Sequence, residues 1–465
     1  MNQEVRLDVA DVAIILLYFI GVLVVGFVVG RKKSGELDDY LLAGRTLTLP
    51  IFVATLVSTW YGGILGVGEF SYRYGISNWF VLGVPYYIFA LLFSLLIAKK
   101  VRATNFITIP DKLEASYDRR TALAGAALTF VLTTPAPYVL MLGILTQLIF
   151  GLSLEMSVIL STLVAVIYLL KGGFRSGVWA NVLQFVLMFA GFAIMLPFAI
   201  SKFGGWGFLE ANLPPLHLTL HGGNAWQYIL VWFFIALWTL VDPAFHQRCY
   251  AAKDGRTAQR GILVSIIFWF VFDALTSTAG LYARAALPTL TEPMFAYPML
   301  AEVTLPSVAK GIFYVGMLAT IMSTLSSLAF ISATTIGKDI VGRLASDGRM
   351  AERWTRYGLL ITVGVSILLA LLIPSVVNLW YMIGTCVIPG LLVPLMASYF
   401  DSLRIPARFA FIAMVLGWGI STASLIWGVV AGAGGQPEYW FGIEPMYPGL
   451  AVAVAVWGVG RAMNN

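Results

Sequence analysis

The stretch VSTWYGGILGVGEF, residues 57–70, decides the fold, because it places glycines at positions 62, 63, 66 and 68 inside an apolar segment. Several glycines weaken a helix locally and free backbone carbonyls, which persist in a membrane only where they face a cavity or a ligand. A second interruption lies in LWTLVDPAFHQR (237–248), where Pro243 removes a helical hydrogen bond and Asp242 places a carboxylate beside the gap. Both stretches are predicted to be broken membrane helices.

Apolar runs of about twenty residues recur along the chain, which is the length that a helix needs to cross a bilayer. Apolar and aromatic residues make up 59% of the 465 residues, and charged residues only 11%. We predict an all-α polytopic membrane protein with about thirteen spans. The predicted spans are 9–30, 48–73, 77–98, 121–150, 154–171, 176–201, 227–245, 261–283, 310–335, 357–374, 376–400, 408–431 and 447–463. Cys249 and Cys386 lack the spacing of metal ligands or of a disulfide framework.

The distribution of basic residues predicts the orientation. The first span ends in Arg31, Lys32 and Lys33, lacks a small-residue cleavage site and is too long for a signal peptide, so we expect a retained helix with its N-terminus outside. The C-terminus is then cytoplasmic, and the cytoplasmic segments hold all of the 29 Lys and Arg residues except Arg6, Arg73, Lys202, Arg284 and Lys310. The net charge of +6 is therefore explained by orientation in the membrane, and no nucleic-acid partner is expected. The expected location is the inner (plasma) membrane.

The two interruptions open the second and the seventh span, five helices apart. This interval is what an inverted repeat of five plus five helices requires, whereas a single Gly or Pro more often marks packing or a kink. We predict a peripheral N-terminal helix in 1–33, a first five-helix repeat in 48–202, a second, inverted repeat in 227–400 and peripheral C-terminal helices in 406–465.

Hydroxyl groups share one face of the span that contains GMLATIMSTLSSLAFISATT (316–335). Thr320, Ser323, Thr324 and Ser327 follow the i, i+3, i+4, i+7 spacing of a helical face. An oxygen-rich face suits a hard monovalent cation. In the alternative reading, each hydroxyl bonds back to the carbonyl one turn earlier or helps neighbouring helices to pack closely.

Two acidic residues are expected inside the bundle, where a carboxylate costs on the order of 2.5–3.5 kcal/mol. Asp273 lies twelve residues into its span, about 18 Å from its cytoplasmic start. Asp242 lies beside the second helix break. Both are candidates for function, and a structural hydrogen bond is the alternative. Glu69, four residues before Arg73, is predicted to form a surface ion pair.

Five further motifs occur in order along nearly the whole chain. They are DYLLAGR (39–45), ITIPDKLEASYDRR (107–120), GGFRSGVWANVLQ (172–184), QRCYAAKD (247–254) and MSTLSS…SATTIGKDI (322–340). This series resembles the sodium:solute symporter family, which includes sodium/sugar, proline, pantothenate and sialic acid transporters. The resemblance implies a LeuT-like fold with a 5+5 inverted-repeat core and peripheral helices at both ends.

The resemblance also implies a sodium ion between the broken first core helix and the eighth. Its ligands would be the side chains of Ser323 and Thr324 and the carbonyl of Thr320. Carbonyls near Val57 and Trp60 would complete the set, although the glycine spacing there departs from that of better-known members.

The same resemblance marks a solute pocket. Asp242 stands where sodium/sugar symporters have a substrate-binding Asn, and Tyr381 stands near a substrate-contacting position of the tenth core helix. Asn181 replaces an Asp that helps some members to bind a second sodium, so one coupled sodium ion is predicted. Tyr61 and Trp60 are further candidates, since aromatic rings stack on a sugar or hold a cation, but they equally fit ordinary packing.

The expected function is import of a small polar organic solute, a polyol, amide or amine, with one sodium ion, by alternating access. A monomer in contact with membrane lipid is expected to suffice. Proton coupling through Asp242 or Asp273, and a transporter-like solute sensor, stay open as alternatives. An enzyme is not expected, because His-Glu-x-x-His, Gly-x-Ser-x-Gly and phosphate-binding Gly-Lys motifs are missing.

Overall fold

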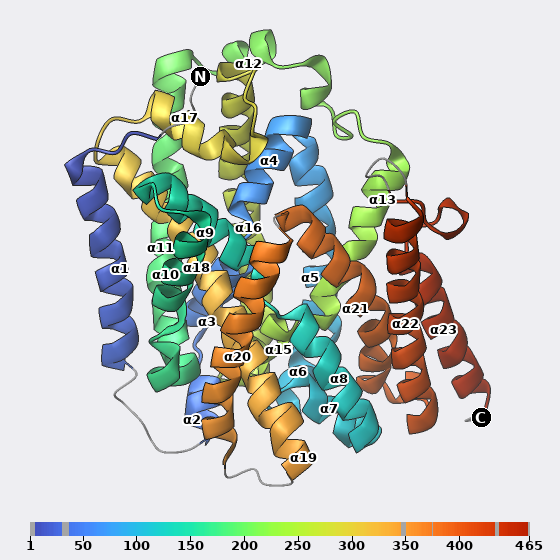
Figure 1. Ribbon diagram of the computed structural model, residues 1–465. Helices are drawn as coiled ribbons and strands as arrows, with labels where there is room; N and C mark the ends of the chain where they lie inside the picture. Colours follow the sequence, from blue (N-terminus) through green and yellow to red (C-terminus); the bar gives the residue numbers. More distant parts are fainter. Residues whose placement is uncertain (1–4, 30–36, 346–349, 374, 433–436, 464–465) are drawn as a thin grey trace.

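The computed structural model describes residues 5–29, 37–345, 350–373, 375–432 and 437–463, which form helices and connecting loops (Figure 1). The basic triplet Arg31, Lys32 and Lys33 lies outside the described residues. An isolated β-bridge joins Leu47 to Ala252.

The first half of the chain contains α1 (Val9–Val29), α2 (Leu37–Leu42), η1 (Ala43–Arg45), α3 (Leu49–Trp60), α4 (Ile64–Tyr74), η2 (Trp79–Gly83), α5 (Val84–Leu96), α6 (Ala98–Ala103), α7 (Ile109–Ser116), α8 (Arg119–Leu132), α9 (Ala136–Phe150), α10 (Leu154–Val166) and α11 (Leu169–Phe203). The second half contains α12 (Trp206–Asn212), η3 (Pro215–Leu218), α13 (Trp226–Ile235), α14 (Trp238–Val241), α15 (Pro243–Ala251), α16 (Gly255–Ala286), η4 (Pro293–Phe295), α17 (Ala296–Thr304), α18 (Ala309–Thr334), η5 (Thr335–Gly342), α19 (Arg343–Ala345), α20 (Ala351–Leu372), α21 (Val376–Ser398), η7 (Asp401–Leu403), α22 (Ala407–Ala431), η8 (Trp440–Gly442) and α23 (Met446–Ala462).

Both predicted helix breaks are confirmed. The axes of α3 and α4 differ by 61° across the glycine-containing turn at residues 61–63. In the second broken helix, α14 ends at Val241 and α15 begins at Pro243, with Asp242 in extended conformation between them. The sequence did not predict one further interruption, between α8 and α9, where Pro135 and Pro137 follow one another closely and stop the first helix.

Among the described residues, ten helices are long and apolar enough to cross a membrane, and the bent α3–α4 pair makes eleven. The predicted spans 154–171 and 447–463 correspond to α10 and α23, which are shorter, of 13 and 17 residues. The count of thirteen spans therefore stays a prediction.

Helix α18 lies at the centre of the bundle, and its apolar span is entirely buried by other helices (Figure 1). Its closest neighbour is α11, because Gly191 and Gly316 face each other: a Cβ atom on Gly191 would lie 2.8 Å from the Cα atom of Gly316. Small residues let membrane helices approach in this way. The hydroxyl-rich face of α18 therefore contacts protein rather than lipid.

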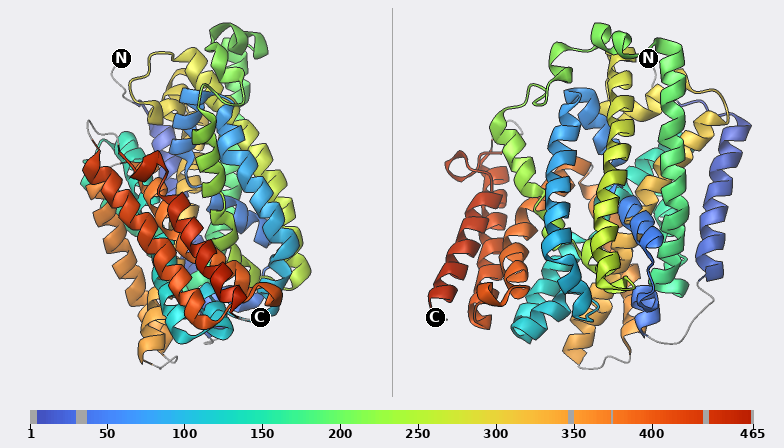
Figure 2. Two further views of the ribbon diagram at one scale, coloured as in Figure 1. Left: turned by 90° about the vertical axis from the view of Figure 1, so that its right-hand side faces the viewer. Right: turned by 180° about the vertical axis from the view of Figure 1, so that it is seen from behind.

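The peripheral helices lie on opposite edges of the bundle. Helix α1 stands at one edge and α22 and α23 at the other, in both the front and the rear view (Figures 1 and 2). Short helices close the two ends: α12 and α17 lie at the end where α1 begins, and α2, α7 and α19 lie at the opposite end, where α23 finishes.

Candidate functional site

The hydroxyl face of α18 meets the broken end of α3. The Ser323 hydroxyl donates to the carbonyls of Ser58, at 2.7 Å, and Thr320, at 2.9 Å. The Thr324 hydroxyl donates to the carbonyls of Thr59, at 2.6 Å, and Ser58, at 3.4 Å. Two hydroxyl and three carbonyl oxygens are thus gathered in a buried position between two helices.

The helix break explains why these carbonyls are accessible. Helix α3 ends at Trp60, so its last carbonyls lack the donors that a continuing helix would supply, and its dipole places partial negative charge there. Gly62 permits the approach of α18, because a Cβ atom at this position would lie 2.3 Å from the Thr324 hydroxyl oxygen. Uncharged oxygens at the C-terminal end of a half-helix suit a sodium ion.

The other predicted ion ligands are placed as follows. The Thr320 hydroxyl bonds back to the Gly316 carbonyl at 2.7 Å, so only its carbonyl takes part in the group of oxygens. Ser323 and Thr324 bond to the carbonyls of Ser58 and Thr59, which are the two residues between Val57 and Trp60. The carbonyls of Val57 and Trp60 stay predicted ligands.

Ser327, the fourth member of the hydroxyl face, serves a separate polar cluster. The hydroxyls of Thr59 and Ser327 lie 3.0 Å apart, and both accept hydrogen bonds from Asn181 Nδ2, at 3.1 and 2.9 Å. Both also accept from Arg248 Nη2, at 2.8 and 2.9 Å. Thr59 therefore connects the two groups, because its carbonyl bonds to Thr324 and its hydroxyl to Arg248.

The guanidinium of Arg248 is completely buried. Its Nη1 atom donates to the uncharged Gln247 side-chain oxygen at 3.0 Å, and its guanidinium carbon lies 5.4 Å from the Phe174 ring centre. A buried Arg is normally paired directly with an acid, whereas here its hydrogen-bond acceptors are neutral oxygens and the Asp242 carboxylate acts on it only through space. The burial of Arg248 could not be predicted from the sequence, because the Gln247–Arg248 pair carries no local signal of burial.

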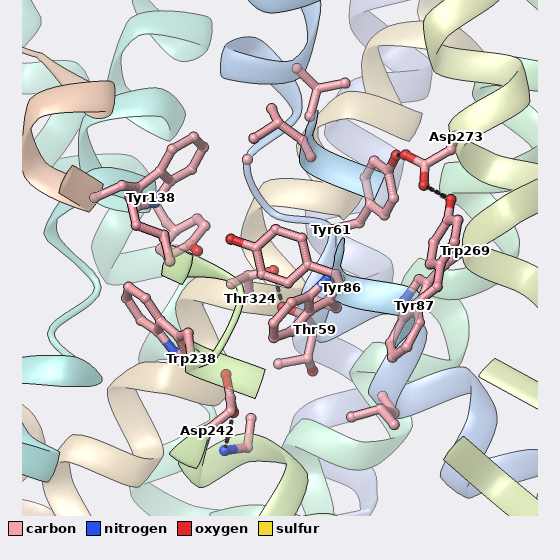
Figure 3. Close-up of a pocket in the computed structure, with 18 of the residues that line it drawn as sticks. Thr59, Tyr61, Tyr86, Tyr87, Tyr138, Trp238, Asp242, Trp269, Asp273 and Thr324 are labelled. Atoms are coloured by element: carbon pink, nitrogen blue, oxygen red, sulfur yellow. Dashed lines mark hydrogen bonds between the residues drawn. The ribbon is translucent and has the colours of Figure 1, made fainter. Parts of the chain in front are cut away.

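A cavity of about 150 Å³ adjoins the group of oxygens and is bordered by residues from both broken helices (Figure 3). Thr59 and Thr324 line both the cavity and the oxygen group. Nine aromatic residues contribute to the remaining wall. They are Trp60, Tyr61, Tyr86, Tyr87, Tyr138, Trp232, Trp238, Trp269 and Trp380.

The cavity also contains the two interior acids. The Asp242 carboxylate caps α15, accepting hydrogen bonds from the backbone N–H groups of Ala244, at 2.6 Å, and Phe245, at 3.1 Å. The Asp273 carboxylate accepts hydrogen bonds from the hydroxyls of Tyr61 and Tyr87. In Figure 3 the two carboxyl groups lie at opposite edges of the group of rings.

The structure brings most of the predicted solute residues together, but not all of them. Asp242, Asp273, Tyr61 and Trp60 line the cavity. Asn181 lies behind Thr59, in the polar cluster.

Tyr381 lies outside the cavity lining, and its hydroxyl donates to Glu444, just before α23, so its predicted contact with the solute stays a prediction. Successive helical residues point about 100° apart, so the adjacent Trp380 points into the cavity while Tyr381 points away. The predicted pair of Glu69 with Arg73 is confirmed at 3.0 Å.

The sequence did not single out several aromatic residues of the cavity wall: Tyr86 on α5, Tyr138 on α9, Trp238 on α14 and Trp380 on α21. These four residues lie in four different apolar helices. Aromatic residues are common in such helices, so nothing in the sequence marks these four as cavity residues. The glycine at position 63 predicts that some group approaches closely, and the structure shows this group to be Trp380, whose ring would lie 2.3 Å from an added Cβ atom.

Three comparisons place the chain among known proteins. The profile of the sodium:solute symporter family matches residues 40–417. The chain is 27% identical to a sodium/pantothenate symporter of Escherichia coli over 94% of this chain and 92% of that protein. It is also 27% identical to high-affinity choline transporter 1 of Drosophila melanogaster, over 81% of this chain and 64% of that transporter.

Among solved structures, a Na⁺-coupled sialic acid symporter in a substrate-bound, outward-open state matches with a TM-score of 0.80. The two chains are 16% identical, and the match covers 98% of this chain and 97% of that one. This likeness shows a shared fold, which is LeuT-like. Since the family profile covers most of its length, the chain belongs to the sodium:solute symporter family.

Proposed function

We propose that this protein imports a small polar organic solute with one sodium ion, by alternating access across the plasma membrane. The observation that supports the proposal is that the group of hydroxyl and carbonyl oxygens lies directly beside the aromatic cavity. The hydroxyls of Ser323 and Thr324 meet the carbonyls of Ser58 and Thr59, and Thr59 and Thr324 also border the aromatic cavity. An ion bound there would hold α3 against α18 and so shape the solute site.

In the proposed cycle, sodium and solute enter from outside at the broken helices, and both leave to the cytoplasm after the core rocks against its scaffold. We further propose thirteen spans, the repeat boundaries given above, an outside N-terminus and a monomer as the transporting unit. One charge crossing 100 mV releases about 2.3 kcal/mol and a tenfold sodium gradient about 1.4 kcal/mol. Together, about 3.7 kcal/mol would hold a neutral solute several hundred-fold concentrated.

The relatives do not decide the charge of the solute. One is named for choline, which is a cation, and another for pantothenate, which is an anion. The match also spans slightly less than two thirds of the choline transporter. Proton coupling through Asp242 or Asp273 is the competing mechanism, because both carboxyl groups are buried beside the cavity.

The first test is the thermal stability of the purified protein in choline-free buffer, with sodium replacing potassium at constant ionic strength and pH. We expect a sodium-specific increase in melting temperature, because an ion that binds only the folded state stabilises it by mass action. The double variant Ser323→Ala/Thr324→Ala is expected to lose this increase.

Thr334→Ala/Thr335→Ala is the matched control. These adjacent hydroxyls donate to carbonyls one turn earlier, at 2.9 and 3.0 Å, so the control also removes two buried hydroxyls, with one more methyl group, away from the proposed ion site. An unchanged sodium response in the Ser323→Ala/Thr324→Ala protein would disprove the ion site. Proton coupling would instead give solute-dependent stabilisation that varies with pH and is indifferent to sodium.

A further inference from the structure

We infer that the solute is a small organic cation of the quaternary ammonium class, held in the cavity by aromatic faces and by the carboxylates of Asp242 and Asp273. This inference rests on the proposed function, because it concerns the same cavity.

The arrangement of rings is the first observation. One group surrounds Trp60, whose ring centre lies 5.2 Å from Tyr86, 5.2 Å from Phe245 and 5.9 Å from Trp269. A second group is formed by Tyr138 and Trp380, 6.1 Å apart and tilted by 53°. Phe245 packs on Trp60 without lining the cavity, whereas the other rings, from helices distant in sequence, line one small space. Such aromatic cages recognise quaternary ammonium groups, because the negative ring faces attract a cation that cannot donate hydrogen bonds.

The charge of the wall is the second observation. Asp242 and Asp273 line the cavity, and none of the lining residues that the structure describes is Lys, Arg or His. The nearby positive charge of Arg248 is directed toward the hydroxyls of Thr59 and Ser327, behind the wall. Arg248 offsets part of the charge of Asp242 through space, whereas the donors that the structure describes for the Asp273 carboxylate are tyrosine hydroxyls. An anionic solute would therefore meet net negative charge, and a cation balances it.

The polar groups of the cavity are the third observation. Among the lining residues that the structure describes, the buried polar atoms without a partner are Asn78 Oδ1 and the indole nitrogens of Trp269 and Trp380, which are few for a sugar. The hydroxyls of Tyr61 and Tyr87 already donate to Asp273, and that of Thr324 donates to Thr59. The Asn78 amide nitrogen donates to Ser277 at 3.1 Å. A polyol needs many hydrogen-bond partners, because its unpaired hydroxyls are costly to bury. An alkylated ammonium needs few.

The size of the cavity agrees with this class. An engineered protein cavity of about 150 Å³ holds a molecule of the size of benzene. The cavity here has the same volume, about 150 Å³. Choline is similar in size to benzene, whereas pantothenate is about twice as large.

The experiment compares binding of choline with binding of its uncharged isostere 3,3-dimethyl-1-butanol, in sodium, to the purified full-length protein. The isostere has the same shape and hydroxyl but lacks the charge. Ethanolamine, glycine betaine and pantothenate complete the set. We expect choline to bind at least tenfold more tightly than the isostere, and glycine betaine more weakly than choline because its carboxylate finds no basic partner.

Variants test the cage itself. Trp60→Leu is expected to weaken choline binding at least tenfold, and Trp60→Phe to weaken it less, because Phe keeps an aromatic face. Asp242→Asn keeps an oxygen that can cap α15 while removing the charge, so its loss of choline affinity reports the charge alone. Trp427→Leu is the control, since that side chain is 56% exposed on α22, away from the cavity.

Each outcome separates this inference from the proposed function. Equal binding of choline and its isostere, or preferential binding of pantothenate, would overturn the inference while the sodium-dependent stabilisation stands. Loss of the sodium response would overturn the proposed function, even if choline still bound. Proteoliposome currents give a second measurement: with one sodium and one cation per cycle, about two charges should cross per solute, against about one for a neutral solute.

Discussion

At the scale of single residues, Arg248 is the most unusual feature of the structure. Its guanidinium is fully buried and shares two hydroxyl acceptors, on Thr59 and Ser327, with the amide of Asn181. The guanidinium therefore fills the position beside the Thr59 and Ser327 hydroxyls, near Asp242, where a sodium ion could otherwise bind. This arrangement gives a structural reason to expect one coupled sodium, in addition to the missing carboxylate at position 181.

This reasoning predicts the behaviour of a double variant. In Asn181→Asp/Arg248→Gln, a carboxylate faces the two hydroxyls without the guanidinium, so a second sodium should bind and the Hill coefficient of sodium activation should rise from about one toward two. Asn181→Asp alone should keep a coefficient of about one, because the new carboxylate would pair with Arg248. A coefficient that stays at one in a transporting double variant would contradict the prediction.

At the scale of elements, the turn between α3 and α4 positions both sites. Gly62 faces Thr324, and Gly63 faces the indole of Trp380, where an added Cβ atom would lie 2.3 Å away in each case. Gly62 also faces the cavity wall, where an added Cβ atom would lie 2.8 Å from the Tyr138 ring. The turn is therefore constrained by the proposed ion site and the cavity wall at Gly62, and by the cavity wall at Gly63.

Substituting the two glycines should separate sodium binding from solute binding. Gly62→Ala should displace Thr324 and raise the sodium concentration for half-maximal stabilisation by about tenfold or more. Gly63→Ala should displace Trp380 and weaken solute binding while leaving the sodium response intact. Gly364→Ala, on α20 where a new Cβ atom meets nothing within 4 Å, is the control. Identical effects of the first two variants on sodium and solute would contradict the assignment.

Another contact between elements joins α7 to η5 and α19, which follow α18. The Asp111 carboxylate pairs with Lys338 and with Arg343, each at 2.5 Å. It also accepts from the backbone of Ile107 and Thr108. Burial alone would raise the pKa of the Asp111 carboxyl, but the two cations and the hydrogen bonds outweigh it and lower this pKa to about 2.

A lowered pKa stabilises the folded state above the unfolded value and loses that effect as the pH falls through the folded value. We expect Asp111→Asn to lower the free energy of unfolding by about 2 kcal/mol at pH 7, and the difference from the unmodified protein to shrink between pH 4 and pH 2. Asp401→Asn is the control, because that side chain is 92% exposed. A difference between Asp111→Asn and the unmodified protein that is constant across this pH range would exclude the ion pairs as its cause.

At the scale of the whole molecule, the two ends of the bundle differ in their elements. Helices α12 and α17 lie at the end where α1 begins, and α2, α7 and α19 lie at the opposite end (Figures 1 and 2). The second group includes or adjoins the basic segments that the charge distribution assigns to the cytoplasm. The proposed orientation therefore places the exposed Ala211 outside the cell and the exposed Ser402 in the cytoplasm.

Labelling with a membrane-impermeant maleimide checks the orientation. We expect Ala211→Cys, on α12, to react in intact cells, and Ser402→Cys, in the loop between α21 and α22, to react only after permeabilisation. The native Cys249 and Cys386 are buried, so the unmodified protein provides the background. Labelling of Ser402→Cys in intact cells would reverse the proposed topology.

Much of the architecture could be predicted from the sequence because it depends on local patterns. The broken helices at residues 61–63 and at Asp242 follow from glycine and proline chemistry. The buried hydroxyl face of α18 follows from helical spacing, and the family follows from motifs in order along the chain. None of these features requires knowledge of which helices touch.

Only the tertiary structure decided which groups meet. The pairing of Ser323 and Thr324 with particular carbonyls, the burial of Arg248 and the inward direction of Trp380 rather than Tyr381 depend on how helices far apart in sequence pack and rotate. A sequence of apolar helices contains many aromatic residues that pack anywhere in the bundle with similar free energy. Their convergence on one cavity is set by contacts across the whole bundle, which no local pattern encodes.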